Sequence, residues 1–162
     1  MKKVLVATLF TAVAFTTSVS AQTSITEVQS LYMYNFIKNI QWNNVSDTYT
    51  IGVYADDATV AEIKAVLGIR KFNGKSILVK KMTSAGQAPN FHIVYVSEAN
   101  SSKIRAIKSS KNTLVVSEKG QLNNGASIAF VLENSKLKFK INESACSASG
   151  LKISKTLMSL SA

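Results

Sequence analysis

Carboxylate and hydroxyl side chains follow three predicted strands, and they are the residues of this sequence best placed to do chemistry. In an open parallel sheet, ligands bind in the crevice beyond the carboxyl ends of the strands. The pattern therefore predicts a small-molecule site formed by Asp57, Ser97, Glu98, Ser117 and Glu118. The three stretches are Tyr54-Ala55-Asp56-Asp57, Tyr95-Val96-Ser97-Glu98 and Val115-Val116-Ser117-Glu118.

The same residue types have a structural interpretation, which is the simpler of the two. Asp and Ser cap helix N-termini, and Glu in a first helical turn interacts favourably with the helix dipole. An enzyme would further need two carboxylates, such as Glu98 and Glu118, close together with perturbed pKa values. No glycine-rich phosphate loop follows a strand, so the fingerprint of a nucleotide site is absent. We expect neither a cofactor nor a catalytic residue.

The sequence has one histidine and one cysteine, which are too few for a structural zinc cluster. His92 lies in an apolar run, where a ring satisfied by structural hydrogen bonds is the simpler interpretation. Cys146 falls on an apolar stripe of a predicted final helix, where a thiol behaves as a small hydrophobe. A lone cysteine forms no intramolecular disulfide, and an intermolecular one would require an exposed thiol.

The N-terminus has the features of a secretory signal peptide over residues 1–21. Lys2 and Lys3 precede a 12-residue apolar run, and small residues lead to a cleavage site after Ala21. The run is too short to span a bilayer, which takes about 20 residues. We therefore expect an exported, periplasmic protein that does not span the membrane, with a single domain over residues 22–162.

The charge balance is basic, with 19 Lys and Arg against 9 Asp and Glu. Removal of the signal peptide would leave a net charge of +8. Export and the scattered lysines argue against nucleic acid as a partner. An anionic membrane surface or an acidic partner is the better functional interpretation, and a solubilising surface is the structural alternative.

Hydrophobic periodicity predicts an α/β fold: one three-layer domain, with a mostly parallel sheet, a C-terminal antiparallel hairpin and flanking helices. Two runs, at 91–96 and 113–116, are continuously apolar, as expected for strands covered by helices on both faces. The run at 136–141 alternates lysine with apolar residues, which indicates a strand near an edge. The other predicted strands are 48–55, 76–82 and 127–133, and the predicted helices are 24–41, 57–67, 99–110 and 142–162.

The first predicted helix has apolar side chains around its whole circumference, whereas a surface helix on a sheet needs only one apolar stripe. Either a second element of the fold covers the extra face, or a partner chain does. In the second case Tyr32, Met33, Tyr34, Phe36 and Trp42 form a partner-binding surface. That hypothesis predicts that Met33 and Tyr34 are partly exposed.

Several segments, in order and spacing, resemble the YfiR-like family of periplasmic regulatory proteins over roughly residues 27–160. The closing stretch is the strongest part of the resemblance. The matching segments are Tyr34-Asn35-Phe36-Ile37-Lys38 followed by Trp42, Ile51-Gly52-Val53 followed by Asp56-Asp57, Asn73-Gly74-Lys75-Ser76-Ile77, Phe91-His92-Ile93-Val94-Tyr95-Val96-Ser97, Ile128-Ala129-Phe130-Val131-Leu132-Glu133, Leu137-Lys138-Phe139-Lys140-Ile141-Asn142 and Gly150-Leu151-Lys152-Ile153-Ser154.

The resemblance implies a periplasmic protein that restrains an inner-membrane signalling protein, with a diguanylate cyclase as the best-known partner, and so affects cyclic di-GMP and biofilm formation. It implies no catalytic residues. The best-known member responds to redox state through cysteine pairs, and the single Cys146 departs from that pattern. An envelope protein that binds a small ligand at the strand ends remains the alternative, and a homodimer remains open.

Overall fold

The computed structural model describes residues 23–43, 45, 47–107 and 110–162. The predicted signal peptide lies outside the described residues. Within them, no helix is both long and apolar enough to cross a membrane.

A seven-stranded sheet forms the centre of the fold, in the order β3-β4-β2-β5-β6-β7-β8. Its five middle strands are parallel, and β3 and β8 pair antiparallel at the two edges. This confirms the predicted parallel sheet and the closing hairpin, with the lysine-alternating strand at an edge. The strands are β2 (Thr48–Tyr54), β3 (Lys71–Phe72), β4 (Lys75–Lys81), β5 (Ile93–Val96), β6 (Leu114–Ser117), β7 (Ile128–Glu133) and β8 (Lys136–Ile141).

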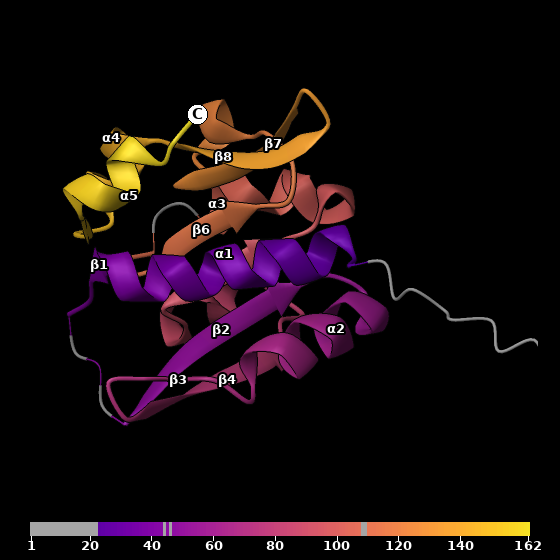
Figure 1. Ribbon diagram of the computed structural model, residues 1–162. Coiled ribbons are helices and arrows are strands. Elements are labelled where there is room, and N and C mark those ends of the chain that lie inside the picture. The colour runs from indigo at the N-terminus through magenta and orange to yellow at the C-terminus, as the bar shows by residue number, and fades with distance from the viewer. Residues whose placement is uncertain (1–22, 44, 46, 108–109) are drawn as a thin grey trace, which may run out of the picture.

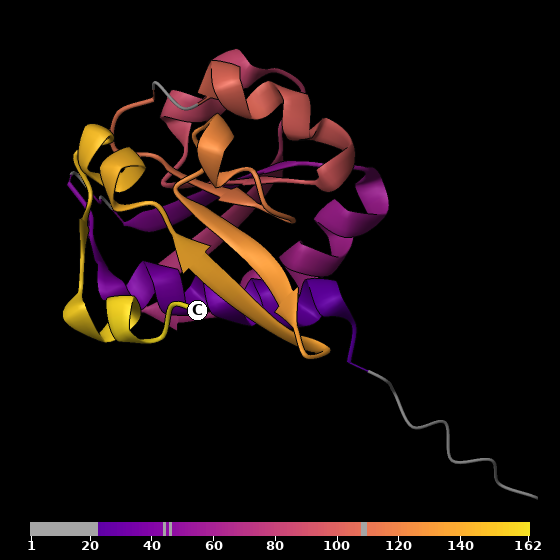
Figure 2. The same ribbon diagram turned by 90° about the horizontal axis from the view of Figure 1, so that it is seen from above.

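Helices cover both faces of the sheet, and this confirms the three layers (Figure 2). The helices α1 and α2 lie together on one face in Figure 1, and the 3₁₀ and α3 segments lie on the other. The predicted helix 99–110 is a 3₁₀ helix followed by one short α-helix, with residues 108 and 109 outside the description. The helical segments are α1 (Ile25–Asn39), α2 (Asp57–Leu67), α3 (Ile104–Ile107), α4 (Glu143–Ala148), α5 (Lys155–Ser159) and the 3₁₀ helices η1 (Ala85–Asn90), η2 (Glu98–Lys103) and η3 (Leu122–Asn124).

The central strands are buried on both faces because alternate side chains enter two separate cores. In β5, Ile93 and Tyr95 enter the core under α1 and α2, whereas Val94 and Val96 enter the core under η1 and α3. All four side chains are buried. The continuous apolar run is thus explained by cover on both sides.

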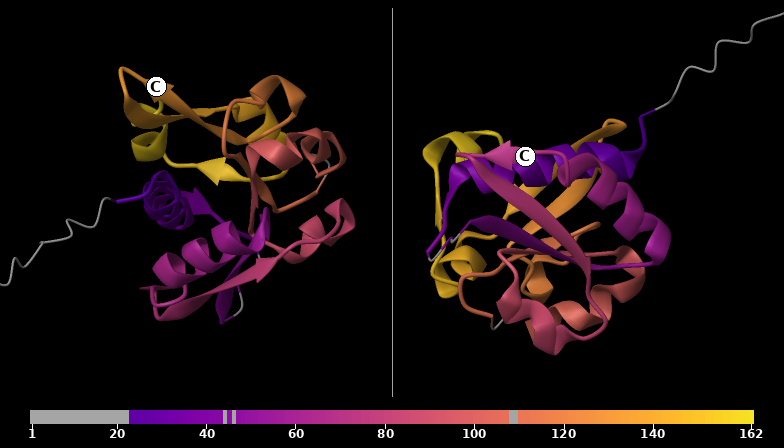
Figure 3. Two further views of the ribbon diagram at one scale, coloured as in Figure 1. Left: turned by 90° about the vertical axis from the view of Figure 1, so that its right-hand side faces the viewer. Right: turned by 90° about the horizontal axis from the view of Figure 1, so that it is seen from below.

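The first helix is covered within the chain, so the expected exposure of Met33 is wrong. Met33 and Phe36 are fully buried, and Tyr34 is half-buried as predicted. Figure 3 (left) looks along α1 and shows the β7–β8 hairpin and α2 on either side of it. Because the sheet, the hairpin and α2 all contact this helix, it needs apolar side chains around most of its axis.

The C-terminal segment is the second correction, because it is not one continuous helix. Gly150 follows α4 with a φ of +77°, a left-handed conformation that ends the helix. The chain then forms β9 (Lys152–Ile153), which pairs antiparallel with β1 (Ile40–Gln41), before α5 begins. The predicted stripe from Cys146 to Leu160 is therefore divided, and Leu160 is exposed.

Candidate functional site

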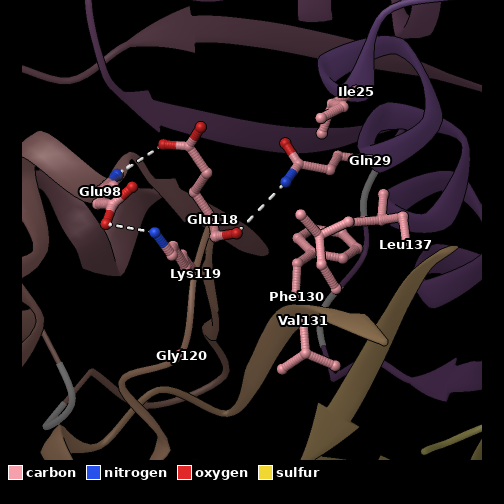
Figure 4. A pocket seen from close by; sticks show the side chains of 10 residues that line it. Ile25, Gln29, Glu98, Glu118, Lys119, Gly120, Phe130, Val131 and Leu137 are labelled. Carbon is pink, nitrogen blue, oxygen red and sulfur yellow. Dashed lines mark hydrogen bonds and ion pairs between the residues drawn. The ribbon is translucent and has the colours of Figure 1, made fainter. Parts of the chain in front are cut away.

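The carboxyl ends of β5, β6 and β7 open onto a groove of about 490 Å³ (Figure 4). Its second side is formed by the first turns of α1 and by the β7–β8 hairpin. The volume is within the range of small-molecule sites, about 300–1,000 Å³. The lining residues are Ile25, Gln29, Glu98, Glu118, Lys119, Gly120, Phe130, Val131, Leu132 and Leu137.

One side of the groove is polar and is formed by the residues that follow β5 and β6. Glu118 Oε2 accepts a hydrogen bond of 2.6 Å from the backbone N–H of Glu98. The Glu98 carboxylate in turn pairs with Lys119 at 3.1 Å, and both side chains are largely exposed. Glu98 and Glu118 therefore both line the groove, with the Glu98 carboxylate in a solvated ion pair.

A buried hydrogen-bond network connects this polar side to α1. The Tyr95 hydroxyl donates to Gln29 Oε1 at 2.9 Å, and Gln29 Nε2 donates to the Glu118 carbonyl at 3.4 Å. Burial, and then the negative charge of nearby Glu118, raise the pKa of Tyr95 well above its usual value. The tyrosine therefore remains a neutral donor that fixes the position of Gln29 at the base of the groove.

The other side of the groove is apolar, and sequence reasoning did not identify it. Phe130 is buried, Leu137 is half-buried, and Ile25 and Leu132 are exposed at 55% and 63%. Leu132 and Leu137 face each other across the hairpin register. One sequence signal pointed to it: Leu132 is an apolar residue at a solvent-facing position of its strand, close to the turn of the hairpin.

The remaining predicted ligand-binding residues do not line the groove. Asp57 pairs with Lys81 at 2.7 Å in the first turn of α2. Ser97 is buried and accepts a hydrogen bond from Asn100, and buried Ser117 is bonded to the backbone of Lys119. These three side chains have structural partners, and none of the three makes a side-chain capping hydrogen bond, because the N-cap of α2 is Asp56.

The residues predicted to bind a partner are divided between the core and the surface. Tyr32 packs on Phe130 and Phe139 and donates its hydroxyl to the Leu137 carbonyl at 3.2 Å. Half-buried Trp42 donates from Nε1 to the Ile37 carbonyl at 3.0 Å. Tyr34 alone of the five lies between charged side chains, which are described below.

The lone histidine and cysteine both have structural partners at the amino-terminal ends of the strands. His92 Nδ1 accepts a hydrogen bond of 3.0 Å from the Thr50 N–H, and burial lowers the pKa of the ring. The Cys146 thiol is buried and donates to the Ser127 carbonyl at 3.7 Å, so it does not meet the condition for an intermolecular disulfide. In the described part of the chain, no three His, Cys, Asp or Glu side chains converge on a metal position.

Taken together, the groove combines apolar surface with a few oriented polar groups. A neutral amide, a backbone carbonyl and two carboxylates face apolar side chains, which is the composition of a binding site. The geometry therefore supports binding of an apolar or amphipathic group.

Known proteins are similar to this chain at two levels. No curated protein matches its sequence. Among solved structures, a conserved domain protein from Vibrio cholerae O1 biovar El Tor has a TM-score of 0.55 and 12% sequence identity, which shows a likeness of fold. The alignment covers 85% of this chain but only 59% of that chain, so this chain spans about three-fifths of that protein's structure.

The family comparison extends over almost the whole described chain. The sequence model of the YfiR/HmsC-like family matches residues 26–162, from the first turn of α1 to the last residue. Members of this family are periplasmic regulators of cyclic di-GMP signalling. The match bears out the resemblance to this family, and the chain therefore belongs to the YfiR/HmsC-like family.

Proposed function

We propose that this chain is a periplasmic, non-enzymatic regulator that restrains a membrane signalling protein, with a diguanylate cyclase as the leading candidate. Its family supports the regulatory role. The observation that carries the proposal is the groove, because its apolar side is open to solvent and lies beside oriented polar groups at strand and helix ends. Exposed apolar surface with a polar rim is typical of protein contact sites.

The contact surface we propose differs from the one expected from sequence. Met33 and Phe36 fill the core and offer no surface to a partner. Ile25 at the start of α1 and Leu132 at the hairpin project beside the groove instead. A partner segment with an apolar side chain could fill the space between them, and the Glu98 and Glu118 backbone and side chains would fix its orientation.

Restraint would follow from a difference in affinity between two conformations of the partner. A regulator that binds the inactive conformation more tightly shifts the population toward it, whereas equal affinity shifts nothing. Loss of the regulator should therefore raise the partner's output. For a cyclase partner, the output is cyclic di-GMP inside the cell, and biofilm formation should increase with it.

The test is deletion of the gene followed by complementation with matched variants. Wild-type protein should return cyclic di-GMP to its original level, and Leu132→Glu should fail because it places a charge in the apolar wall. Leu160→Glu is the control, since Leu160 has nearly the same exposure (62%) and lies away from the groove. Unchanged cyclic di-GMP after deletion would contradict the proposal.

The groove volume favours one second candidate, an envelope protein that binds a small amphipathic ligand there. A ligand that binds only the native state raises the melting temperature by mass action. In a thermal-shift screen of periplasmic metabolites, a true ligand should lose its effect on Glu118→Gln. The effect should persist on Glu143→Gln, a control at the first residue of α4, and a loss on both variants would contradict a site at the groove.

A further inference from the structure

The end of the molecule opposite the groove has a cluster of cations around a half-exposed tyrosine. It lies where α1 and α2 end and where β1, β3 and β9 lie. We call this surface the basic end. Its residues are Tyr34, Lys38, Ile69, Arg70, Lys71 and Lys152.

Contacts on Tyr34 hold the cluster together. Lys38 Nζ lies 5.5 Å and Arg70 Cζ lies 5.6 Å from the centroid of the tyrosine ring. The Tyr34 hydroxyl donates to the Lys71 carbonyl at 2.9 Å. Lys152 lines the same shallow hollow as Lys38. The Tyr34 side chain therefore contacts Lys38, Arg70 and the backbone of Lys71, and Lys152 lies beside Lys38 in the hollow.

The four cations of this surface have no ion-pair partner among the described residues. In the described ranges, which include every carboxylate of the sequence, the ion pairs involve Lys81, Lys119, Lys138 and Lys140 and none of the four cations of the basic end. Seven of the nine carboxylates lie in first helical turns, in α2 or at strand ends on the opposite side of the fold. These are Glu27, Asp56, Asp57, Glu62, Glu98, Glu118 and Glu133.

An exposed apolar side chain stands next to the cations. Ile69 lies in the loop between α2 and β3 and is 83% exposed, the highest value among the large hydrophobic residues described. It directly precedes Arg70 and Lys71. An isoleucine and a tyrosine among lysine and arginine form the combination that binds anionic membrane surfaces, where apolar groups insert and cations contact headgroups.

We propose that the basic end docks the protein onto an anionic lipid bilayer. Charge complementarity selects this occupant: the surface offers four cations without carboxylate partners, and each Lys or Arg near an anionic membrane strengthens binding roughly fivefold. Ile69 would enter the headgroup region beside the cations. An anionic bilayer accounts for both features, since its headgroups attract the cations and its interface accepts the isoleucine.

Docking would also fix where the groove faces. The helix α1 begins at the groove and ends at the basic end, and its 15 residues span about 20 Å at 1.5 Å per residue. With the basic end on the membrane, the groove would therefore open about 20 Å above the lipid surface. It would then meet the exported domain of a membrane protein rather than the membrane itself.

The test is sedimentation of the mature protein with lipid vesicles. Vesicles of phosphatidylcholine with about one-third phosphatidylglycerol should bind the protein, and pure phosphatidylcholine vesicles should bind it at least tenfold more weakly. Lys38→Glu with Arg70→Glu should reduce binding to the anionic vesicles at least thirtyfold, because two favourable charges become repulsive. Ile69→Ser should reduce it about fivefold, and this loss should persist in high salt.

A matched charge control separates docking from a general effect of net charge. Lys80→Glu with Lys103→Glu changes the net charge equally, on β4 and η2, away from the basic end. This control should bind within about threefold of the wild type. Equal loss in both double variants, no binding to anionic vesicles, or capture only by an acidic peptide would overturn the proposal. Since the assay contains no partner, its outcome is independent of the regulatory function proposed above.

Discussion

The groove end and the basic end of this protein differ in charge and in how their side chains are held. At the groove end, apolar side chains face carboxylates and a buried network through Gln29 and Tyr95. At the basic end, cations lie on a half-exposed Tyr34 without carboxylate partners among the described residues. One small domain thus presents two chemically distinct surfaces.

The direction of the elements explains much of this difference. Both α1 and α2 begin at the groove end and end at the basic end, with an acid in each first turn (Glu27, Asp57) and a lysine in each last turn (Lys38, Lys64). Acids are favourable at helix N-termini and bases at C-termini. The same rule that stabilises each helix therefore separates charge across the whole fold, and functional surfaces can use the separation.

The largest loss of stability should follow from substitution of Phe36, because this side chain of α1 is fully buried in the core between the two ends. Phe36→Ala should lower the free energy of unfolding by about 3–5 kcal/mol, since it leaves a cavity among Tyr32, Phe130 and Phe139. Tyr34→Ala on the same helix should cost under about 1 kcal/mol. Urea denaturation measures both, and equal costs would contradict the view that α1 is a core helix.

A smaller loss of stability is expected when the buried hydrogen-bond network at the groove end is broken. Gln29→Leu leaves the Tyr95 hydroxyl without its acceptor and should cost about 1–3 kcal/mol. Tyr95→Phe should cost a similar amount, and the double variant should cost less than the sum of the two. Strictly additive costs in a urea double-mutant cycle would show that the two side chains do not interact.

A pH dependence should distinguish the amino-terminal ends of the strands, where His92 lies, from their carboxyl-terminal ends, where Asp56 lies. Burial, and then the charge of Lys75, lower the pKa of His92 below 6.5, so the unfolded state binds its proton more readily and stability should fall as the pH drops below about 6.5. At the other end, the hydrogen bond from the Thr59 N–H lowers the pKa of Asp56, so its contribution is lost only below pH 3.8. His92→Asn keeps an acceptor for Thr50 and should remove the decline in melting temperature below about pH 6.5. If the variant's melting temperature depends on pH as that of the wild type does, the decline belongs to another group.

The smallest effect on stability is expected from ionisation of the Cys146 thiol at alkaline pH. Burial raises its pKa to about 11, so the native thiol stays protonated while the unfolded one ionises near pH 9. The stability that this group contributes is present below pH 9 and is lost as the pH rises toward 11. At pH 8 the native protein should resist an aromatic disulfide reagent, and unfolded protein should react within minutes. Rapid reaction of native protein would show an accessible thiol and reopen the intermolecular disulfide.

The sheet and its layers could be predicted because their signals are local. Two apolar runs indicated strands covered on both faces, and β5 and β6 are such strands. The turn at Asn73-Gly74, with positive φ at both residues, and the lysine-alternating edge strand β8 also follow from short-range rules. In each case a few neighbouring residues contain enough information.

The incorrect predictions depended on contacts between distant segments. The apolar stripe after Cys146 suggested one helix, but Gly150 adopts a left-handed conformation and the following residues pair with β1. Met33 was expected at the surface because the sequence does not indicate that the β7–β8 hairpin and α2 both lie against α1. Nothing in the strand-end pattern indicated Leu132 or Ile25, since the second wall of the groove comes from other elements.

We propose that the groove end, and not the body of α1, binds the membrane partner. The most direct test places a photo-crosslinking amino acid at position 132 or at position 160 of the tagged protein, two sites with similar exposure. After irradiation in the native envelope, mass spectrometry identifies what each position has captured. We predict that position 132 captures a membrane protein with a cytoplasmic signalling domain and that position 160 does not. Capture of such a protein from position 160 alone, or from neither position, would contradict partner binding at the groove end.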